Sequence, residues 1–138
     1  MSLFQTKMIR KDYILRQIGQ ILEALIRIFS KIQSGNDTYN PDEIQDLYLK
    51  YFNKNATFFT ALSTDDIAKF FKENNDTEEV FARLQVLSEL LFGEGQVSKN
   101  QQLQLKAIDI LQYITEHSGI FDWERNRRLV EMKKYMSD

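Results

Sequence analysis

The sequence contains no cysteine, one histidine, one proline and five glycines among its 138 residues. The absence of cysteine excludes disulfides, thiolate metal sites and cysteine nucleophiles. The single histidine, His117, excludes metal sites and catalytic schemes that need two imidazole groups. Because an all-β fold needs many tight turns, so few prolines and glycines disfavour it. We therefore predict an all-α protein.

Long apolar runs are missing as well. Charged residues interrupt the apolar positions of the N-terminal region, and no stretch approaches the roughly 20 uncharged residues of a membrane-spanning helix. The N-terminus also has no pattern of a secretory signal peptide. We therefore expect a cytoplasmic protein that does not enter a membrane.

The chain has no large excess of positive charge. Residues 1–33 carry six basic and two acidic side chains, residues 34–97 carry five and twelve, and residues 98–138 carry seven and six. A nucleic-acid-binding domain usually has a concentrated basic face. An acidic middle region and a net charge of -2 therefore disfavour nucleic acid as a partner.

The sequence is rich in apolar residues at helical spacing. The region from Met8 to Gln33 predicts one long helix, whose apolar side chains cover an arc of roughly 160°. About 26 residues would form a rod near 39 Å long. So wide an apolar face can be buried in two ways: later helices cover most of it, or a second copy of the chain covers part of it in a homodimer. We expect the first, with this helix at the centre of the fold.

Capping residues and apolar stripes predict further helices, about six to seven in total, in one domain spanning residues 1–138. Residues 1–7 are expected to be disordered or partly derived from cloning. Further helices are expected to begin near Pro41, Ser63, Asp76, Ser98 and Asp122, with a buried helical turn at 56–62. Gly93 and Gly95 are expected to end the helix that starts at Asp76. The last helix is expected to be anchored by Trp123, Leu129, Val130 and Met136.

Residues 81–114 fit the frame of a tetratricopeptide helix-turn-helix without a gap. Five residues match its apolar, small and turn positions: Leu84, Leu87, Ser88, Leu91 and Gly95, with Gly95 at the turn. Asn100, Gln104 and Gln112 depart from it, because the repeat has alanine, an aromatic residue and proline there. The segment is therefore a degenerate tetratricopeptide-like hairpin.

A wider resemblance covers most of the chain. It is carried by the segments MIRKDYILRQI (8–18), ALSTDDIAKFF (61–71), LSELLFGEG (87–95) and LKAIDILQYI (105–114). These resemble a family of short, uncharacterised bacterial proteins with a tetratricopeptide-like helical fold. The resemblance implies an all-α array of antiparallel helix hairpins, and it supplies no activity, cofactor or catalytic residue.

The residues that could carry chemistry have simpler structural interpretations. His117 lies near a predicted helix C-terminus, where a cation interacts favourably with the helix dipole. The pairs Asp65-Asp66 and Glu78-Glu79 lie in predicted first turns, where negative charge is stabilising. We therefore predict no catalytic, cofactor-binding or metal-binding residue and no enzyme activity. A carboxylate-based site assembled between helices stays open as an alternative.

Two groups of residues are candidates for binding a partner. Arg10, Asp12 and Tyr13 form either a recognition patch or a helix start whose charges cap and pair along the helix. Arg125 and Arg128 belong to a basic last helix that either contacts nucleic acid or an acidic partner, or pairs with the acidic residues interleaved with it.

The leading functional hypothesis is a non-enzymatic helical interaction module, an adaptor or scaffold that presents a groove to a protein or peptide. The alternative is a small regulatory or nucleic-acid-associated protein that uses the basic C-terminal helix. Without a cofactor pattern or a nucleophile paired with a base, the first is favoured.

Overall fold

The computed structural model describes the backbone of residues 3–33 and 41–137, and the side chains of residues 12–31 and 42–137 except Ile14. These residues form helices and no strand, which confirms the all-α class. The helices are α1 (Leu3–Gln33), α2 (Pro41–Phe52), α3 (Ala56–Thr60), α4 (Thr64–Lys72), α5 (Thr77–Ser98), α6 (Gln101–His117) and α7 (Trp123–Ser137). Because α1 begins at Leu3, it starts ahead of the expected Met8. Residues 1–2 lie outside the described part, and the cloning origin of 1–7 stays a prediction.

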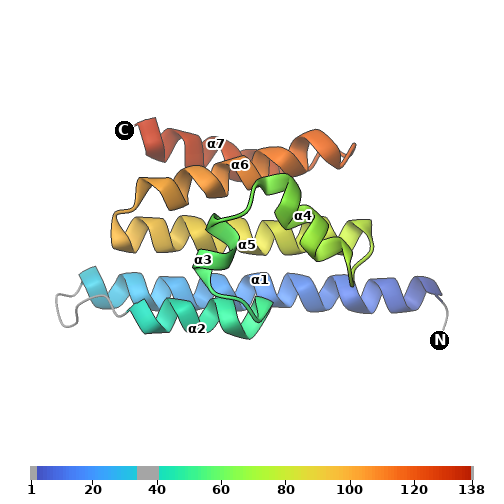
Figure 1. Cartoon of the computed structure of the whole chain (residues 1–138), viewed down its shortest axis with the longest axis horizontal. Coiled ribbons are helices and arrows are strands. Elements are labelled where there is room, and N and C mark those ends of the chain that lie inside the picture. Colours follow the sequence, from blue (N-terminus) through green and yellow to red (C-terminus); the bar gives the residue numbers. More distant parts are fainter. Residues whose placement is uncertain (1–2, 34–40, 138) are drawn as a thin grey trace.

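The four longest helices lie side by side in the order α1, α5, α6, α7 (Figure 1). α1 and α5 run in the same direction, and α6 and α7 each run opposite to the helix before them. α2 lies along α1, while α3 and α4 cross from α2 to the start of α5. α5, rather than α1, occupies the centre, because it packs against α1, α2, α4 and α6.

The central helix is buried all round along its second half. Every residue from Val86 to Gly95 is buried. α5 continues through both glycines to Ser98, so the expectation that Gly93 and Gly95 end this helix is wrong. Their role is close packing: a Cβ on Gly95 would lie 2.5 Å from Cγ of Gln104 and 2.9 Å from the carbonyl oxygen of Asn100. A Cβ on Gly93 would meet Leu25 of α1 at 2.7 Å.

α5 and α6 form a tight antiparallel hairpin. The turn is at Lys99, whose φ of 57° is left-handed, and the Asn100 side chain caps α6 by accepting from two backbone amides. The turn therefore lies at Lys99 rather than at the expected Gly95, and the cap of α6 is Asn100 rather than the expected Ser98. The Ser88 hydroxyl donates to the carbonyl oxygen of Ala107 at 2.8 Å, so a small residue at this position lets the two helices approach.

Helix starts that depend on local sequence lie where expected. Ser63 caps α4 by accepting from the Asp66 amide at 3.1 Å. Asp76 and Glu79 form a reciprocal capping box at the start of α5, in which each side chain accepts from the other's backbone amide. Asn40, the expected cap of α2, lies outside the described residues.

Five phenylalanines join the end of α2 to the short helices α3 and α4. They are Phe52, Phe58, Phe59, Phe70 and Phe71, and their contacting rings have centroids 5.0 to 6.2 Å apart. Aromatic pairs at these distances add stability beyond the area that they bury. The cluster confirms the buried helical turn expected around residues 56–62.

α7 packs through a narrower stripe than the sequence indicates. Leu129 and Met132 are buried, and Met136 is half-buried, at the spacing of one helix face. Trp123 and Val130, which were also expected to anchor this helix, are 78% and 58% exposed. They lie on the opposite side, because α7 is the outermost helix and only α6 and the edge of α5 cover it (Figure 1).

Candidate binding pocket

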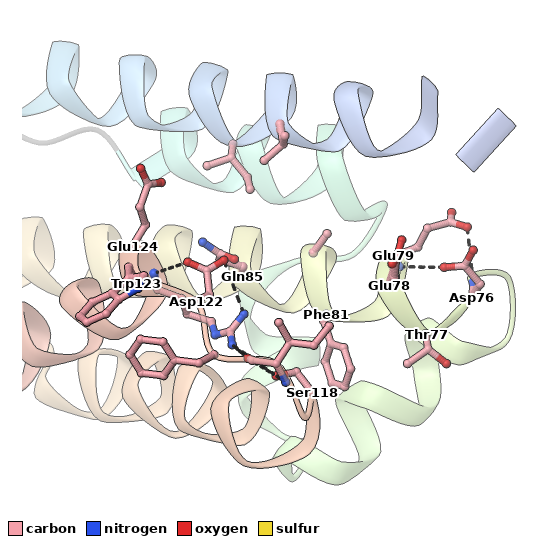
Figure 2. A pocket seen from close by; sticks show the side chains of 16 residues that line it. Asp76, Thr77, Glu78, Glu79, Phe81, Gln85, Ser118, Asp122, Trp123 and Glu124 are labelled. Atoms are coloured by element: carbon pink, nitrogen blue, oxygen red, sulfur yellow. Dashed lines mark hydrogen bonds and ion pairs between the residues drawn. The ribbon is translucent and has the colours of Figure 1, made fainter. Parts of the chain in front are cut away.

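A pocket of about 500 Å³ lies between α1, the first two turns of α5 and the turn that joins α6 to α7 (Figure 2). Its volume is within the usual range for ligand sites. The inner wall is apolar and is formed by Leu15 and Ile18 of α1 with Phe81 and Ala82 of α5. Segments from three parts of the sequence therefore build one concave surface.

Three large apolar side chains stand at the outer edge of this pocket. Ile120 and Phe121 of the turn and Trp123, the first residue of α7, are 71%, 60% and 78% exposed, although polar residues are usual at such a connection. The rings of Phe121 and Trp123 contact each other edge to face, with centroids 4.9 Å apart. Contiguous exposed apolar surface of this kind marks interaction sites in soluble proteins.

A buried arginine holds the turn in place. The Arg125 guanidinium donates from Nη2 to the carbonyl oxygen of Ile120 at 2.8 Å and to the Ser118 hydroxyl at 3.3 Å. Its backbone amide donates to Asp122, which caps α7. Gly119 adopts the left-handed φ of 70° expected at the end of α6. These contacts hold the backbone of the turn that carries the exposed Ile120 and Phe121.

The pocket is bordered by acidic residues at two sides. Asp76, Glu78 and Glu79 come from the first turn of α5, and Asp122 and Glu124 come from the start of α7. Figure 2 shows the first group to the right of Phe81 and the second group to its left, beside Trp123. Among the described lining residues, Arg125 is the only basic one.

The candidate residues of the opening motif lie near one end of α1. Asp12 and Tyr13 are exposed, and the side chain of Arg10 lies outside the described residues. Neither Asp12 nor Tyr13 lines the pocket. Tyr13 lies toward α2 instead: burial raises the pKa of Tyr51, and the charge of Tyr13 raises it further.

The candidate residues of the last helix have separate positions. Arg125 lies in the pocket wall, while Arg128 bridges α7 to α5 by donating from Nε to Glu89 at 2.8 Å and stacking over Phe92 at 5.3 Å. Arg128 and Arg127 both approach Glu131, and Lys133 donates to Gln112. The structure thus brings Arg127, Arg128 and Lys133 of α7 into contact with acidic and polar groups of the same chain. The four candidates whose side chains it describes do not gather in one site.

A buried carboxylate lies outside the pocket, between α2 and α5. Glu94 accepts from the Tyr48 hydroxyl at 2.9 Å and from the Gln45 amide at 2.8 Å. Burial raises the pKa of Glu94, while these two hydrogen bonds lower it, and the net direction is upward. No role was predicted for Glu94, because a glutamate between two glycines resembles a turn.

The pocket was not predicted, because its walls come from three helices that are distant in sequence. One signal could have indicated it. Three large apolar residues, Ile120, Phe121 and Trp123, follow directly on the helix-ending Gly119 and surround the cap Asp122. So apolar a connection between two helices is unusual in a soluble domain.

Within the described residues, no three His, Cys, Asp or Glu side chains gather to hold a metal ion. None of the helices in the same residues is both long and apolar enough to span a membrane. No protein-family model matches the chain, and no curated protein or solved structure matches it either. The resemblance to tetratricopeptide-like bacterial proteins therefore stays a prediction.

Proposed function

We propose that the protein is a non-enzymatic helical interaction module, an adaptor or scaffold that binds a protein or peptide at the pocket between α1, α5 and the α6–α7 turn. The observation that carries this proposal is the exposure of Ile120 and Phe121, on a turn held by Arg125, and of Trp123 at the start of α7. Fully burying one large apolar side chain is worth about 1.5–3 kcal/mol. Covering these three with a partner would therefore supply a substantial part of a binding free energy.

Preorganisation supports the same function. A binding surface that is already rigid loses little conformational entropy when a partner docks. Here the guanidinium of Arg125, the cap Asp122 and the left-handed Gly119 all fix the backbone of the turn. We also propose a tetratricopeptide-like array, supported by the antiparallel succession of α5, α6 and α7 (Figure 1). No contact favours the nucleic-acid alternative, since the basic residues of α7 meet carboxylates and amides of the same chain.

The test is selection of peptides from a random display library on the wild-type protein. Trp123 is the only tryptophan, so its fluorescence reports directly on this surface. We expect selected peptides to shift its emission and to lose at least about tenfold in affinity to an Ile120→Ser/Phe121→Ser variant. Val130→Ser, which removes an exposed apolar side chain elsewhere on α7, is the matched control and should bind normally. Peptides that bind all three proteins equally would contradict the proposal.

A further inference from the structure

The charges around the pocket restrict the chemistry of what it can bind. Within the described residues, five carboxylates line it, against the single guanidinium of Arg125. The N-termini of α5 and α7 also point their dipoles at the pocket, each equivalent to about half a positive charge. Among the side chains that the structure describes, the carboxylates outweigh these positive contributions by about three charges.

The carboxylates differ in how far they are already used. Asp76 and Asp122 accept backbone amides at the starts of α5 and α7, and Glu79 is buried within the capping box. Glu78 and Glu124 are exposed and form no ion pair with any other described residue. These two side chains are therefore the ones that an incoming cationic group would meet first.

An anionic ligand fits the pocket less well. Nε of the buried Arg125 has no partner among the described atoms and could donate one hydrogen bond to a carboxylate. However, the side chains of Asp76 and Asp122 already occupy the helix N-termini, which are the positions where an anion would gain most. The exposed Glu78 and Glu124 would then repel it.

We propose that the occupant of this pocket is a basic segment of a separate protein, with a large apolar side chain as its anchor and lysine or arginine on both sides of it. The anchor packs among Leu15, Phe121 and Trp123. The flanking cations reach Glu78 on one side and Glu124 on the other (Figure 2). This inference rests on the proposed function and adds the charge of the partner to it.

Three synthetic peptides with the same Leu-Phe-Leu centre test the charge: one flanked by two lysines at each end, one by glutamates and one by serines. We expect the lysine peptide to shift Trp123 emission and to bind at least about tenfold more tightly than the serine peptide, and the glutamate peptide to bind most weakly. The affinity of the lysine peptide should fall as the salt concentration rises from about 0.01 to 1 M, because the screening length shrinks from about 30 to about 3 Å.

The Glu78→Gln/Glu124→Gln variant locates the effect. It should weaken the lysine peptide by at least about tenfold and leave the serine peptide unchanged. Asp109→Asn, an exposed acidic position on α6 outside the pocket lining, is the control and should bind as the wild type does.

Other results would overturn the inference. Equal affinity for the lysine and serine peptides would contradict the charge assignment. So would a loss of lysine-peptide binding in Asp109→Asn as large as the loss in the double variant. Either result would still allow the pocket to be a docking site. If none of the three peptides binds, the inference fails, and the display selection decides the proposed function separately. If the free protein forms a dimer and the Glu78→Gln/Glu124→Gln variant does not, the occupant of the pocket is a second copy of the chain. That result would rule out a separate partner as the occupant.

Discussion

Glycines in α5 and α1 have opposite environments, although both are helical. Gly95 faces backbone of the α5–α6 turn, whereas a Cβ on Gly19 would meet nothing within 4 Å. Alanine is favoured over glycine in a helix by about 1 kcal/mol. At Gly95 that gain is outweighed by overpacking against atoms that cannot move easily.

We therefore expect Gly95→Ala to destabilise the protein by about 1–3 kcal/mol and Gly19→Ala to stabilise it by about 0.5–1 kcal/mol. Urea unfolding followed by circular dichroism measures both free energies. A Gly95→Ala variant as stable as Gly19→Ala would show that α6 is not packed this closely on α5.

Glu94 predicts a specific dependence of stability on pH. Because burial raises its pKa above the usual 4.5, the folded state favours the protonated carboxyl. The stability that Glu94 contributes is therefore fully present below pH 4.5, and it falls as the pH rises through the higher pKa of the folded state. The wild type should lose stability relative to Glu94→Gln as the pH rises across this window.

Urea unfolding at a series of pH values gives the difference between the two proteins. Glu73→Gln, at an exposed position, is the control that corrects for the rest of the chain. A constant difference between wild type and Glu94→Gln from pH 4 to 8 would contradict the burial of this carboxylate.

At the scale of helices, the sequence correctly predicted helix starts that are set by residues next to each other in the chain. The caps Ser63 and Asp76 are local signals, and they lie at helix starts as expected. The end of α5 was mispredicted, because Gly93 and Gly95 resemble stop signals until the approach of α1 and α6 is known. The full lining of the pocket could not be predicted, since no local pattern brings Leu15 of α1 and Phe121 into one pocket.

One ion pair joins α7 to α5, beside the edge-to-face contact of Phe92 with Tyr135. The Glu89 side chain is 7% exposed, and its Oε2 has no hydrogen-bond partner in the described structure. Removing Arg128 would leave this carboxylate buried and unpaired, at a cost of about 2 kcal/mol or more. We expect Arg128→Ala to show that loss in thermal or urea unfolding.

Two further variants check this interpretation. Adding Glu89→Gln to Arg128→Ala should recover much of the stability, because the uncompensated charge is then removed. Arg127→Ala, whose side chain is 74% exposed and 4.0 Å from Glu131, should change stability by less than about 0.5 kcal/mol. If Arg127→Ala and Arg128→Ala were equally destabilising, the buried pair would not hold α7 in place.

At the scale of the whole molecule, α1 is covered on one side only. Ile21, Leu25 and Ile28 belong to the core, whereas Leu15, Leu22 and Ile26 are 55%, 39% and 62% exposed. The wide apolar arc of the sequence is thus real, and within the described residues only part of it is covered. Whether a second copy covers the rest is a matter of measurement.

Ile21→Ala should cost about 2–5 kcal/mol by leaving a cavity in the core. Ile26→Ala should change stability by less than about 0.5 kcal/mol if the protein is a monomer. A larger loss that disappears on dilution would show that a homodimer covers this strip. Sedimentation equilibrium of the wild type provides the independent check.

The phenylalanine cluster has a consequence for how the molecule opens. α3 has only five residues, too few to persist by its own hydrogen bonds, so its backbone is protected only while the rings of α2 and α4 surround it. Amide protons of α3 and α4 should therefore exchange with solvent as one cooperative unit, at a lower opening free energy than those of α5. Phe59→Leu should speed exchange throughout this unit and leave the amides of α6 protected.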